Sequence, residues 1–309
     1  MPELATVIAI LLATVKAGTP LVFAALGELV TEKSGVLNLG IEGMMLVGAV
    51  TGFMATVLSG NIAVGVLVAM LSGVVISLIF GFLTLTMLAN QVATGLALTI
   101  FGIGLSAFVG LPWIGTPISG LQSLEIPLLG DIPVLGPLLF GHDLLVYLSL
   151  LMFAAVSWFL FRTRAGLVVR AVGESHDAAH ALGYSVVRIR YLTVMFGGAM
   201  SGLAGAYLSL VYTPQWAENM SAGRGWIALA LVVFATWKPL RVLLGAWLFG
   251  GITIAALHIQ AAGFNFSSHL LATLPYLATV AVLVLISRDA TRIRLNAPAS
   301  LGKPFHPGA

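Results

Sequence analysis

The sequence contains no cysteine and very little charge. Without cysteine in its 309 residues, disulfides, zinc–thiolate sites and iron–sulfur clusters are excluded. Only 8% of the residues are charged, against roughly 25% in soluble domains, and 59% are hydrophobic. No polar stretch is long enough to form a separate soluble domain. The composition therefore predicts an all-α, polytopic membrane protein with a single transmembrane domain over residues 1–309.

Apolar segments alternate with short polar ones along most of the chain. A spanning helix needs about 20 apolar residues. The first segment, Leu4 to Ala17, is slightly short, and Thr19-Pro20 restarts the chain before a stretch that ends at Val30. This pattern predicts about ten transmembrane helices, including a broken or short second helix from Pro20 to Val30. The later expected spans cover residues 41–58, 62–88, 92–110, 144–161, 191–212, 226–237, 242–262 and 270–286.

Basic residues are distributed unevenly between the two ends of these segments. Cytoplasmic loops carry an excess of Lys and Arg. With ten spans and both termini cytoplasmic, twelve basic residues lie inside, whereas Lys16 and Arg224 lie outside. The sequence therefore predicts cytoplasmic N and C termini, with residues 288–309 as a cytoplasmic tail.

Residues 111–143 interrupt the apolar pattern. They hold five prolines, three acidic residues and no Lys or Arg. Such an irregular segment cannot cross the membrane in contact with lipid. We expect an extracytoplasmic loop, and a plain structured connection is favoured over any catalytic role.

The stretch from Gly27 to Gly48 places Glu28, Glu32, Lys33 and Glu42 within hydrocarbon-rich sequence. Charge inside an apolar segment is costly, and glycine lets the backbone bend. Two interpretations stay open. The stretch is a broken membrane segment lining a path, or it is a short cytoplasmic loop in which Glu42 pairs with Lys33 or caps a broken helix. The broken-helix motif consists of Ser34, Gly35, Asn38, Gly40, Glu42 and Gly43.

Polar side chains elsewhere in the apolar sequence are candidates for a translocation path. Amide side chains offer both donors and acceptors to a hydroxylated or heterocyclic solute. Hydrogen bonding between helices is the alternative, and it is somewhat favoured for any single residue. Replacing Glu42 with Ala is expected to impair transport more than expression. The candidate path residues are Asn38, Glu42, Asn90, Gln91 and Gln215.

Residues 162–190 form the one long basic, amphipathic stretch. We expect a short helix over Glu174 to Leu182 with an Ala-rich face, ending at Gly183. Such a helix between two spans has the shape to dock into a groove of another protein. The alternative is a basic loop that only sets topology. His176 and His180 are four residues apart, but no third ligand is apparent, so no metal site is predicted.

Four blocks of the sequence resemble one family of transport proteins. They are SGVLNLGIEGMMLVGA from Ser34, NQVATGLALTIFGIGLSAF from Asn90, RAGLVVRAVGESHDAAHALGYSV from Arg164 and GRGWIALALVVFATWKPL from Gly223. Together they resemble inner-membrane permease subunits of ABC-type importers, in the branch that serves simple sugars, branched-chain amino acids and, most closely, nucleosides. Tyr184 and Ala235-Thr236 depart from the usual pattern.

The resemblance implies a subunit of the bacterial cytoplasmic (inner) membrane that moves a nucleoside by alternating access. It implies no cofactor and no ATPase site of its own, and the sequence contains no GxxxxGK[ST] loop. The expected partners are cytoplasmic ATP-binding subunits, a second permease (a related chain or a copy), an extracytoplasmic substrate-binding protein and membrane lipid, with no nucleic acid. The implied ATPase-coupling residues in the cytoplasmic loop 162–190 are Gly166, Arg170, Gly173, Glu174, Ala178, Ala179, Leu182 and Gly183.

Two alternatives remain. The same class of importer could carry ribose-like sugars. A stand-alone, ion-coupled secondary transporter also uses broken helices with intramembrane carboxylates, but it has no need of an Ala-faced docking helix.

Overall fold

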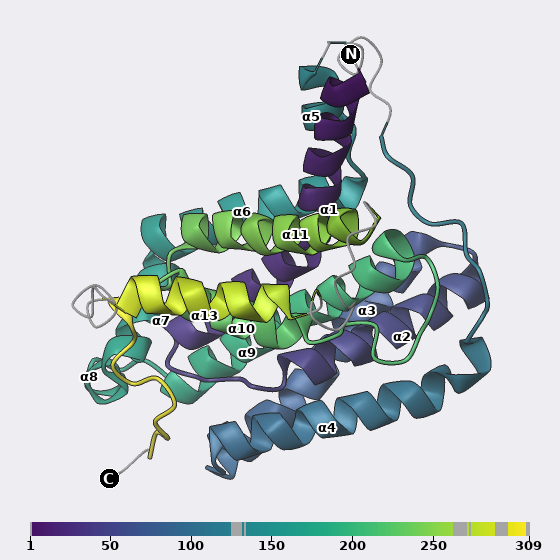
Figure 1. The fold of residues 1–309 in the computed structure, drawn as a ribbon. Coiled ribbons are helices and arrows are strands. Elements are labelled where there is room, and N and C mark those ends of the chain that lie inside the picture. Colours follow the sequence, from purple (N-terminus) through teal and green to yellow (C-terminus); the bar gives the residue numbers. More distant parts are fainter. Residues whose placement is uncertain are drawn as a thin grey trace.

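The computed structural model describes residues 2–124, 132, 134–261, 271, 273–287 and 296–306. These residues are helical apart from loops and one isolated β-bridge, between Ser123 and Asp143, which confirms the all-α prediction (Figure 1). Seven described helices are long and apolar enough to cross a membrane. They are α1 (Pro2–Lys33), α2 (Ile41–Ser59), α3 (Ile62–Gly81), α4 (Gln91–Gly110), α6 (Leu144–Arg162), α9 (Val186–Tyr207) and α11 (Pro239–Ala261). π-Helical turns, Phe82–Thr86 and Leu208–Tyr212, extend α3 and α9.

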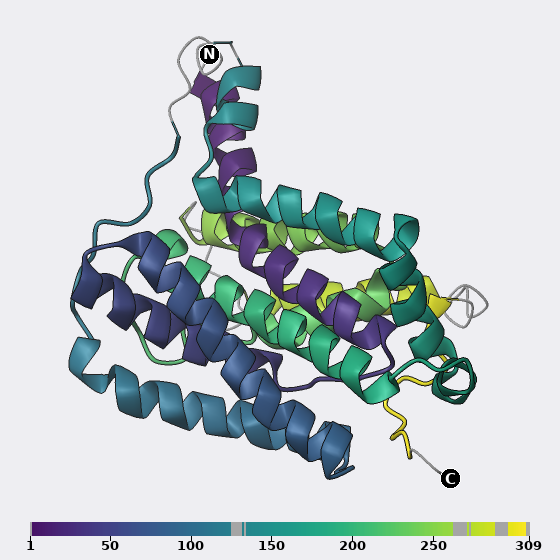
Figure 2. The ribbon, with the colours of Figure 1, turned by 180° about the vertical axis from the view of Figure 1, so that it is seen from behind.

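Helix α1 is continuous, so the predicted break at Thr19-Pro20 is wrong. Pro20 lies inside the helix, and proline bends a helix without necessarily ending it. Both views show α1 changing direction between its amino-terminal part and the part packed in the bundle (Figures 1 and 2). The chain leaves helical structure only after Lys33, at residues 34–40. The predicted count of ten spans treated α1 as two and is not confirmed.

The packed part of α1 runs from one end of the bundle to the other. At one end, Lys16 Nζ lies 3.5 Å from the hydroxyl of Ser123, within the irregular segment 111–124. At the other end, Lys33 Nζ donates a hydrogen bond to the carbonyl oxygen of Asn296, at the start of the described tail. These contacts put the segment 111–124 and the carboxyl-terminal tail at opposite ends of the molecule.

Helix α9 occupies the middle of the bundle and contacts α1, α2 and α3, whereas α4 lies at the edge against α2 (Figure 2). Glycines allow these backbones to touch. A Cβ on Gly73 of α3 would lie 2.1 Å from the carbonyl oxygen of Gly198 in α9. A Cβ on Gly48 of α2 would lie 2.5 Å from the Cα of Gly202. Small residues at helix contacts permit this close approach.

Residues 162–190 fold differently from the prediction in detail. The expected short helix over Glu174 to Leu182 is present as α8 (His176–Ala181), and a helix that the sequence did not predict, α7 (Arg164–Glu174), directly precedes it. The break occurs at Ser175, whose side chain accepts a hydrogen bond from the Ala178 N–H and so caps α8. Gly183, at a φ of +86°, ends the segment before α9.

Two further described helices are shorter, and the first of them is too short to cross a bilayer. Helix α10 (Arg224–Phe234) has 11 residues and is about 16 Å long, roughly half of the ~30 Å hydrocarbon thickness. Helix α13 (Leu274–Ser287) has 14. The expected span 226–237 is therefore a half-length helix, which contacts α1, α2, α11 and α13. The remaining short elements are a 3-10 turn at Leu111–Trp113 and α5 (Leu135–Phe140).

Candidate translocation and coupling site

The non-helical segment 34–40 is buried, and side chains from other helices satisfy its backbone. Glu28 of α1 accepts a hydrogen bond from the Asn38 N–H at 3.1 Å, and Gln91 of α4 accepts one from the Leu37 N–H at 2.8 Å. The hydroxyl of Thr99 donates to the carbonyl oxygen of Leu39. Irregular backbone is tolerated at membrane depth only where protein or a cavity supplies such partners. Residues 34–40 thus form a supported break between α1 and α2.

Two of the candidate path residues belong to this break. Asn38 is fully buried, and its Oδ1 accepts a hydrogen bond from the Gly40 N–H at 2.9 Å, which fixes the turn before α2. Gln91 accepts a hydrogen bond from the break through its carbonyl oxygen, but its buried amide nitrogen has no hydrogen-bond partner among the described residues. A buried donor without a partner is costly. Of these two side chains, Gln91 therefore keeps a buried donor that no described residue accepts, whereas the Asn38 amide nitrogen contacts Met44 Sδ.

Glu42 caps a helix other than its own. It lies in the first turn of α2, 3% exposed, and its carboxylate accepts hydrogen bonds from the Ser221 hydroxyl, the Gly223 N–H at 2.8 Å and the Gly225 N–H at 2.6 Å. These donors form the amino terminus of α10, where a negative charge is favoured by the helix dipole. Glu42 thus caps α10, about 180 residues further along the chain, rather than a helix within the stretch 27–48.

The other end of α10 also meets a carboxylate. Glu32 of α1 is fully buried and accepts a hydrogen bond from Trp237 Nε1. Thr236 and Trp237 both adopt positive φ values, 48° and 52°, directly after the helix. One oxygen of Glu32 and one of Glu28 are buried and have no hydrogen-bond partner in the part of the chain that the structure describes. Helix α10 is therefore held at both ends by acids from α1 and α2.

The remaining two candidate path residues lie elsewhere. Asn90 is exposed and caps α4 by accepting a hydrogen bond from the Ala93 N–H. Gln215 is exposed in the loop after α9, next to Pro214, whose carbonyl oxygen accepts from the Ile118 N–H. Thr193 of α9 donates a hydrogen bond to Ser34 in the break. Gln215 follows Thr193 by 22 residues, which at the helical rise puts it roughly 30 Å from the break. The structure therefore does not gather the five residues into one site.

Arg190 joins the break to the predicted coupling segment. The side chain is 1% exposed and donates hydrogen bonds to the carbonyl oxygens of Ser34 and Lys303 at 3.2 and 3.1 Å. Its Nη2 lies 3.3 Å from Nδ1 of His176 in α8. Because an arginine can only donate, Nδ1 must accept. Burial, and then the charge of Arg190, lower the pKa of His176, which favours this neutral ring.

The eight predicted coupling residues divide into a buried and an exposed group. A Cβ on Gly166 would lie 1.9 Å from the Phe159 carbonyl oxygen, and one on Gly173 would lie 2.2 Å from that of Lys33. These glycines hold α7 close to α6 and to the end of α1. Arg170 is half-buried, with its guanidinium 5.2 Å from the centre of the Phe161 ring. The exposed members are Glu174, Ala178, Leu182 and Gly183, whereas Ala179 is 3% exposed.

Ala179 faces the carboxyl-terminal tail, which returns beneath α7 and α8. It packs in one cluster with Val172, Val186 and Phe305. The rings of His176 and His180 meet Phe305 edge-on, at 5.4 and 5.2 Å between centroids. Both histidines thus pack against the tail, and the part of the chain that the structure describes contains no group of three or more His, Cys, Asp or Glu residues able to hold a metal ion.

Sequence reasoning missed Arg190, Ser221, Trp237 and Phe305. Arg190 was assigned only to the basic loop, although it stands at the membrane end of that loop, where a charge requires buried partners. Ser221 precedes Gly223 and Gly225, and this polar, glycine-containing sequence is followed by only 11 helical residues. A helix that begins at membrane depth needs an acceptor for its free N–H groups. This requirement alone indicates that the start of α10 has a buried partner elsewhere in the chain.

Comparisons with known proteins agree on one family. The profile described as "Branched-chain amino acid transport system / permease component" matches residues 10–286. TsgC13 of Haloferax volcanii, named provisionally as a glucose ABC transporter permease protein, is 39% identical over 95% of this chain and 96% of its own length. The guanosine ABC transporter permease protein NupQ of Bacillus subtilis is 33% identical over 77% of this chain and 78% of its own. The nucleoside ABC transporter permease protein NupC of Lactococcus lactis is 29% identical over 86% and 88%.

Proposed function

Because the chain belongs to the branched-chain amino acid transport system permease family, as an ABC transporter permease of the sugar and nucleoside type, we propose that it moves a nucleoside inward across a bacterial cytoplasmic membrane. Its apolar helices make it a multi-pass membrane protein, and the ATPase is carried by a separate partner. We propose that ATP-binding subunits dock on α7 and α8, that a second permease completes the path and that an extracytoplasmic binding protein delivers the solute.

The observation that carries this proposal is the Arg190 junction. One side chain bonds to the break at Ser34, to the tail at Lys303 and to α8 at His176. A displacement of α8 by an ATP-binding subunit would therefore act directly on the break between α1 and α2. Alternating access requires such a mechanical connection, because a ligand shifts an equilibrium only through contacts that differ between the two states.

The docking surface proposed for the ATP-binding subunits is the exposed part of the coupling residues. Ala178 and Leu182 are exposed, the latter to 78%. They lie on and directly after α8, and Asp177 adds an exposed carboxylate. Leucine and alanine beside a polar rim are typical of a helix that enters a partner's groove.

We place the path along the break. Gln91 offers its free buried amide N–H groups to a hydroxyl or ring nitrogen of the solute. Asn38 and Glu42 shape this region by fixing the starts of α2 and α10. Asn90 and Gln215, both exposed, would then lie near the cytoplasmic and extracytoplasmic ends of the path.

The contacts of α1 support a revised orientation. With α7, α8 and the tail cytoplasmic, as the positive-inside rule favours, Lys33 is inside and Lys16 lies beside the extracytoplasmic segment 111–124. One crossing by α1 then places the amino terminus outside, rather than inside as the sequence predicted. The carboxyl terminus keeps its predicted cytoplasmic position.

The relatives support two solute classes that share a sugar ring. NupQ and NupC are named for guanosine and nucleosides, which agrees with the nucleoside proposal. The assignment of TsgC13 to glucose favours a simple sugar as the second candidate. Both solutes carry hydroxyl groups that amide side chains can recognise.

The test is an intact-mass measurement of the complex purified through a tag on this chain from its native membrane. We expect two ATP-binding subunits and a second permease to accompany it, and the associated binding protein to bind nucleosides. Purification of the chain alone or with itself only, in gentle detergent with an ATP analogue, would contradict the proposal and favour a stand-alone transporter.

A further inference from the structure

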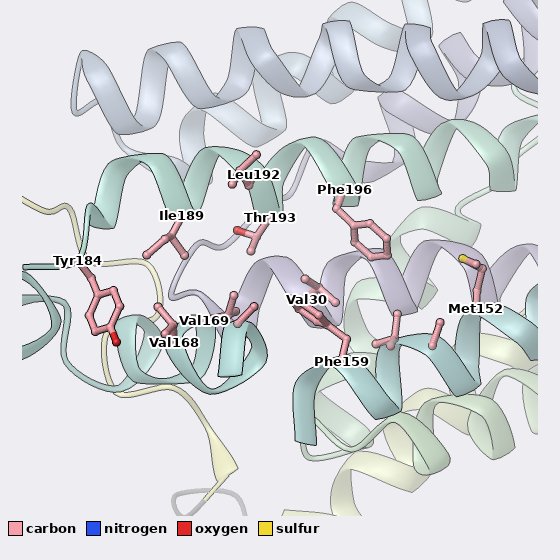
Figure 3. Close-up of a pocket in the computed structure, with 13 residues that line it drawn as sticks. Val30, Met152, Phe159, Val168, Val169, Tyr184, Ile189, Leu192, Thr193 and Phe196 are labelled. Atoms are coloured by element: carbon pink, nitrogen blue, oxygen red, sulfur yellow. The ribbon is translucent and has the colours of Figure 1, made fainter. Parts of the chain in front are cut away.

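An apolar groove of about 630 Å³ opens between α6, α7 and α9 (Figure 3). Its floor contains Val30 of α1 and Val169 of α7, which are 4% and 6% exposed. Its rim contains Leu192 of α9 and Tyr184, which are 58% and 42% exposed. The groove therefore has a packed base and an open side.

The lining is unsuited to a sugar or a nucleoside. Among the thirteen lining residues only Thr193 and Tyr184 have polar side chains. The Thr193 hydroxyl is already committed, since it donates to Ser34 and lies 2.9 Å from the Arg190 carbonyl oxygen. A hydroxylated solute would lose its hydrogen bonds to water here without replacement. The groove suits a hydrocarbon chain.

The surroundings of the groove are basic. Arg164 precedes the lining residue Ala165, and Arg188 precedes Ile189; both arginines are exposed and make no ion pair among the described residues. The sequence has no Asp or Glu from residue 144 to 173 or from residue 178 to 212. Of the elements that line the groove, α6 and α9 thus carry no acid and α7 carries only its terminal Glu174; the acids of α1 that flank Val30, Glu28 and Glu32, are buried.

From this combination we infer that the groove binds an anionic phospholipid of the cytoplasmic leaflet. One acyl chain lies between α6 and α9, and the phosphate meets Arg164 and Arg188. Anionic headgroups on the cytoplasmic side attract basic residues, and basic pockets between transmembrane helices bind them. Tyr184, on the rim, suits the membrane–water interface, where tyrosine is enriched.

The bound lipid would support the coupling segment. Val168 and Val169 of α7 line the groove, and α7 continues directly to Ser175 and α8. An acyl chain that fills the groove supplies packing contacts that α7 otherwise lacks on that side. The lipid is therefore expected to hold α7 and α8 in position for the partner proposed above. The choice of leaflet and this regulatory effect rest on the proposed function and its orientation; lipid binding itself does not.

Native mass spectrometry of the full-length chain, with whatever partners copurify, tests the inference by titration with phosphatidylglycerol and phosphatidylcholine. Phosphatidylglycerol is expected to be retained preferentially. Ala155→Trp places a large ring in the groove and should weaken phosphatidylglycerol binding about tenfold, the loss expected when roughly 1.4 kcal/mol of contact is removed. Ala154→Trp is the matched control, because Ala154 is also exposed on α6 but does not line the groove.

The headgroup contact is tested separately. Arg164→Gln and Arg188→Gln should each lower phosphatidylglycerol affinity about fivefold, the value of one basic residue at an anionic surface, without changing phosphatidylcholine binding. Lys238→Gln, which removes an exposed charge after α10, should have no effect. Equal retention of both lipids, or equal losses in the two tryptophan variants, would overturn the inference.

Two outcomes separate this site from the proposed function. If Ala155→Trp releases a protein partner while phosphatidylglycerol still binds, the occupant of the groove is a protein and the inference is wrong. If phosphatidylglycerol binding behaves as expected but no ATP-binding subunit copurifies, the lipid site stands and the importer proposal fails.

Discussion

Replacing Glu42 removes the acceptor for three donors at the start of α10. In Glu42→Ala the Ser221 hydroxyl and the N–H groups of Gly223 and Gly225 lose their partner in a buried site. Each unsatisfied buried donor costs about 1–3 kcal/mol. Since the vacated space can admit a water that satisfies part of this set, we expect a net loss of about 3–5 kcal/mol.

Glu42→Gln is the sharper variant because it keeps the volume of the side chain. In either orientation of the amide, at least one backbone N–H faces the new amide nitrogen instead of an oxygen. The charge that favours the helix amino terminus is also lost. The expected destabilisation is about 2–3 kcal/mol, and Ser221→Ala in the Gln background should cost less than in the wild type.

Unfolding of the purified protein in detergent, followed by tryptophan fluorescence, measures these losses. Glu218→Gln is the matched control, because Glu218 is exposed in the loop before α10 and should change stability by less than about 0.5 kcal/mol. The cap also revises the expectation from sequence: Glu42→Ala should reduce folded protein and transport together. Stability of Glu42→Ala equal to that of Glu218→Gln would refute the capping role.

Three further predictions follow from the contacts described above. Ala178→Trp, on the exposed side of α8, should prevent ATP-binding subunits from copurifying without lowering the thermal stability of the chain. Ala179→Trp should instead lower the thermal stability, because Ala179 belongs to the buried cluster beneath α8. Gly225→Ala places a Cβ 2.6 Å from a Cα of α2 and should cost about 2 kcal/mol or more in unfolding experiments; Gly104→Ala, with nothing within 4 Å, should be neutral. Arg190→Gln should reduce solute-stimulated ATPase activity about tenfold, as for the loss of a coupling of 1–3 kcal/mol, while the subunits still copurify; unchanged stimulation would contradict the coupling role.

Local signals predicted the helix boundaries best where polar residues cap them. The expected spans 62–88 and 92–110 begin within one or two residues of α3 and α4, which Asn61 and Asn90 cap. The predicted break at Thr19-Pro20 is wrong because proline is compatible with a bent membrane helix. The residues around Pro20 do not distinguish a bend in a helix from its end.

Long-range partners account for what could not be predicted. The acceptor for α10 lies about 180 residues earlier in the chain, at Glu42, and the tail residue Phe305 packs on α8 more than 120 residues before it. The amide residues share their chemistry but not their surroundings: Asn90, next to Gln91, is exposed and caps α4, and Gln215 lies in the loop after α9. Periodicity and composition describe single elements, whereas these contacts depend on how the elements are packed together.

The two carboxylates that hold α10 have a consequence for biosynthesis. A half-length helix of 11 residues is a poor candidate for independent insertion by the translocon. Glu32 and Glu42 are both translated long before α10 emerges from the ribosome, so the receiving site is already in the bilayer when the short helix arrives. A permuted chain that begins near Gly183 would make α10 before its acceptors, and it should stall as an incompletely inserted, protease-sensitive intermediate.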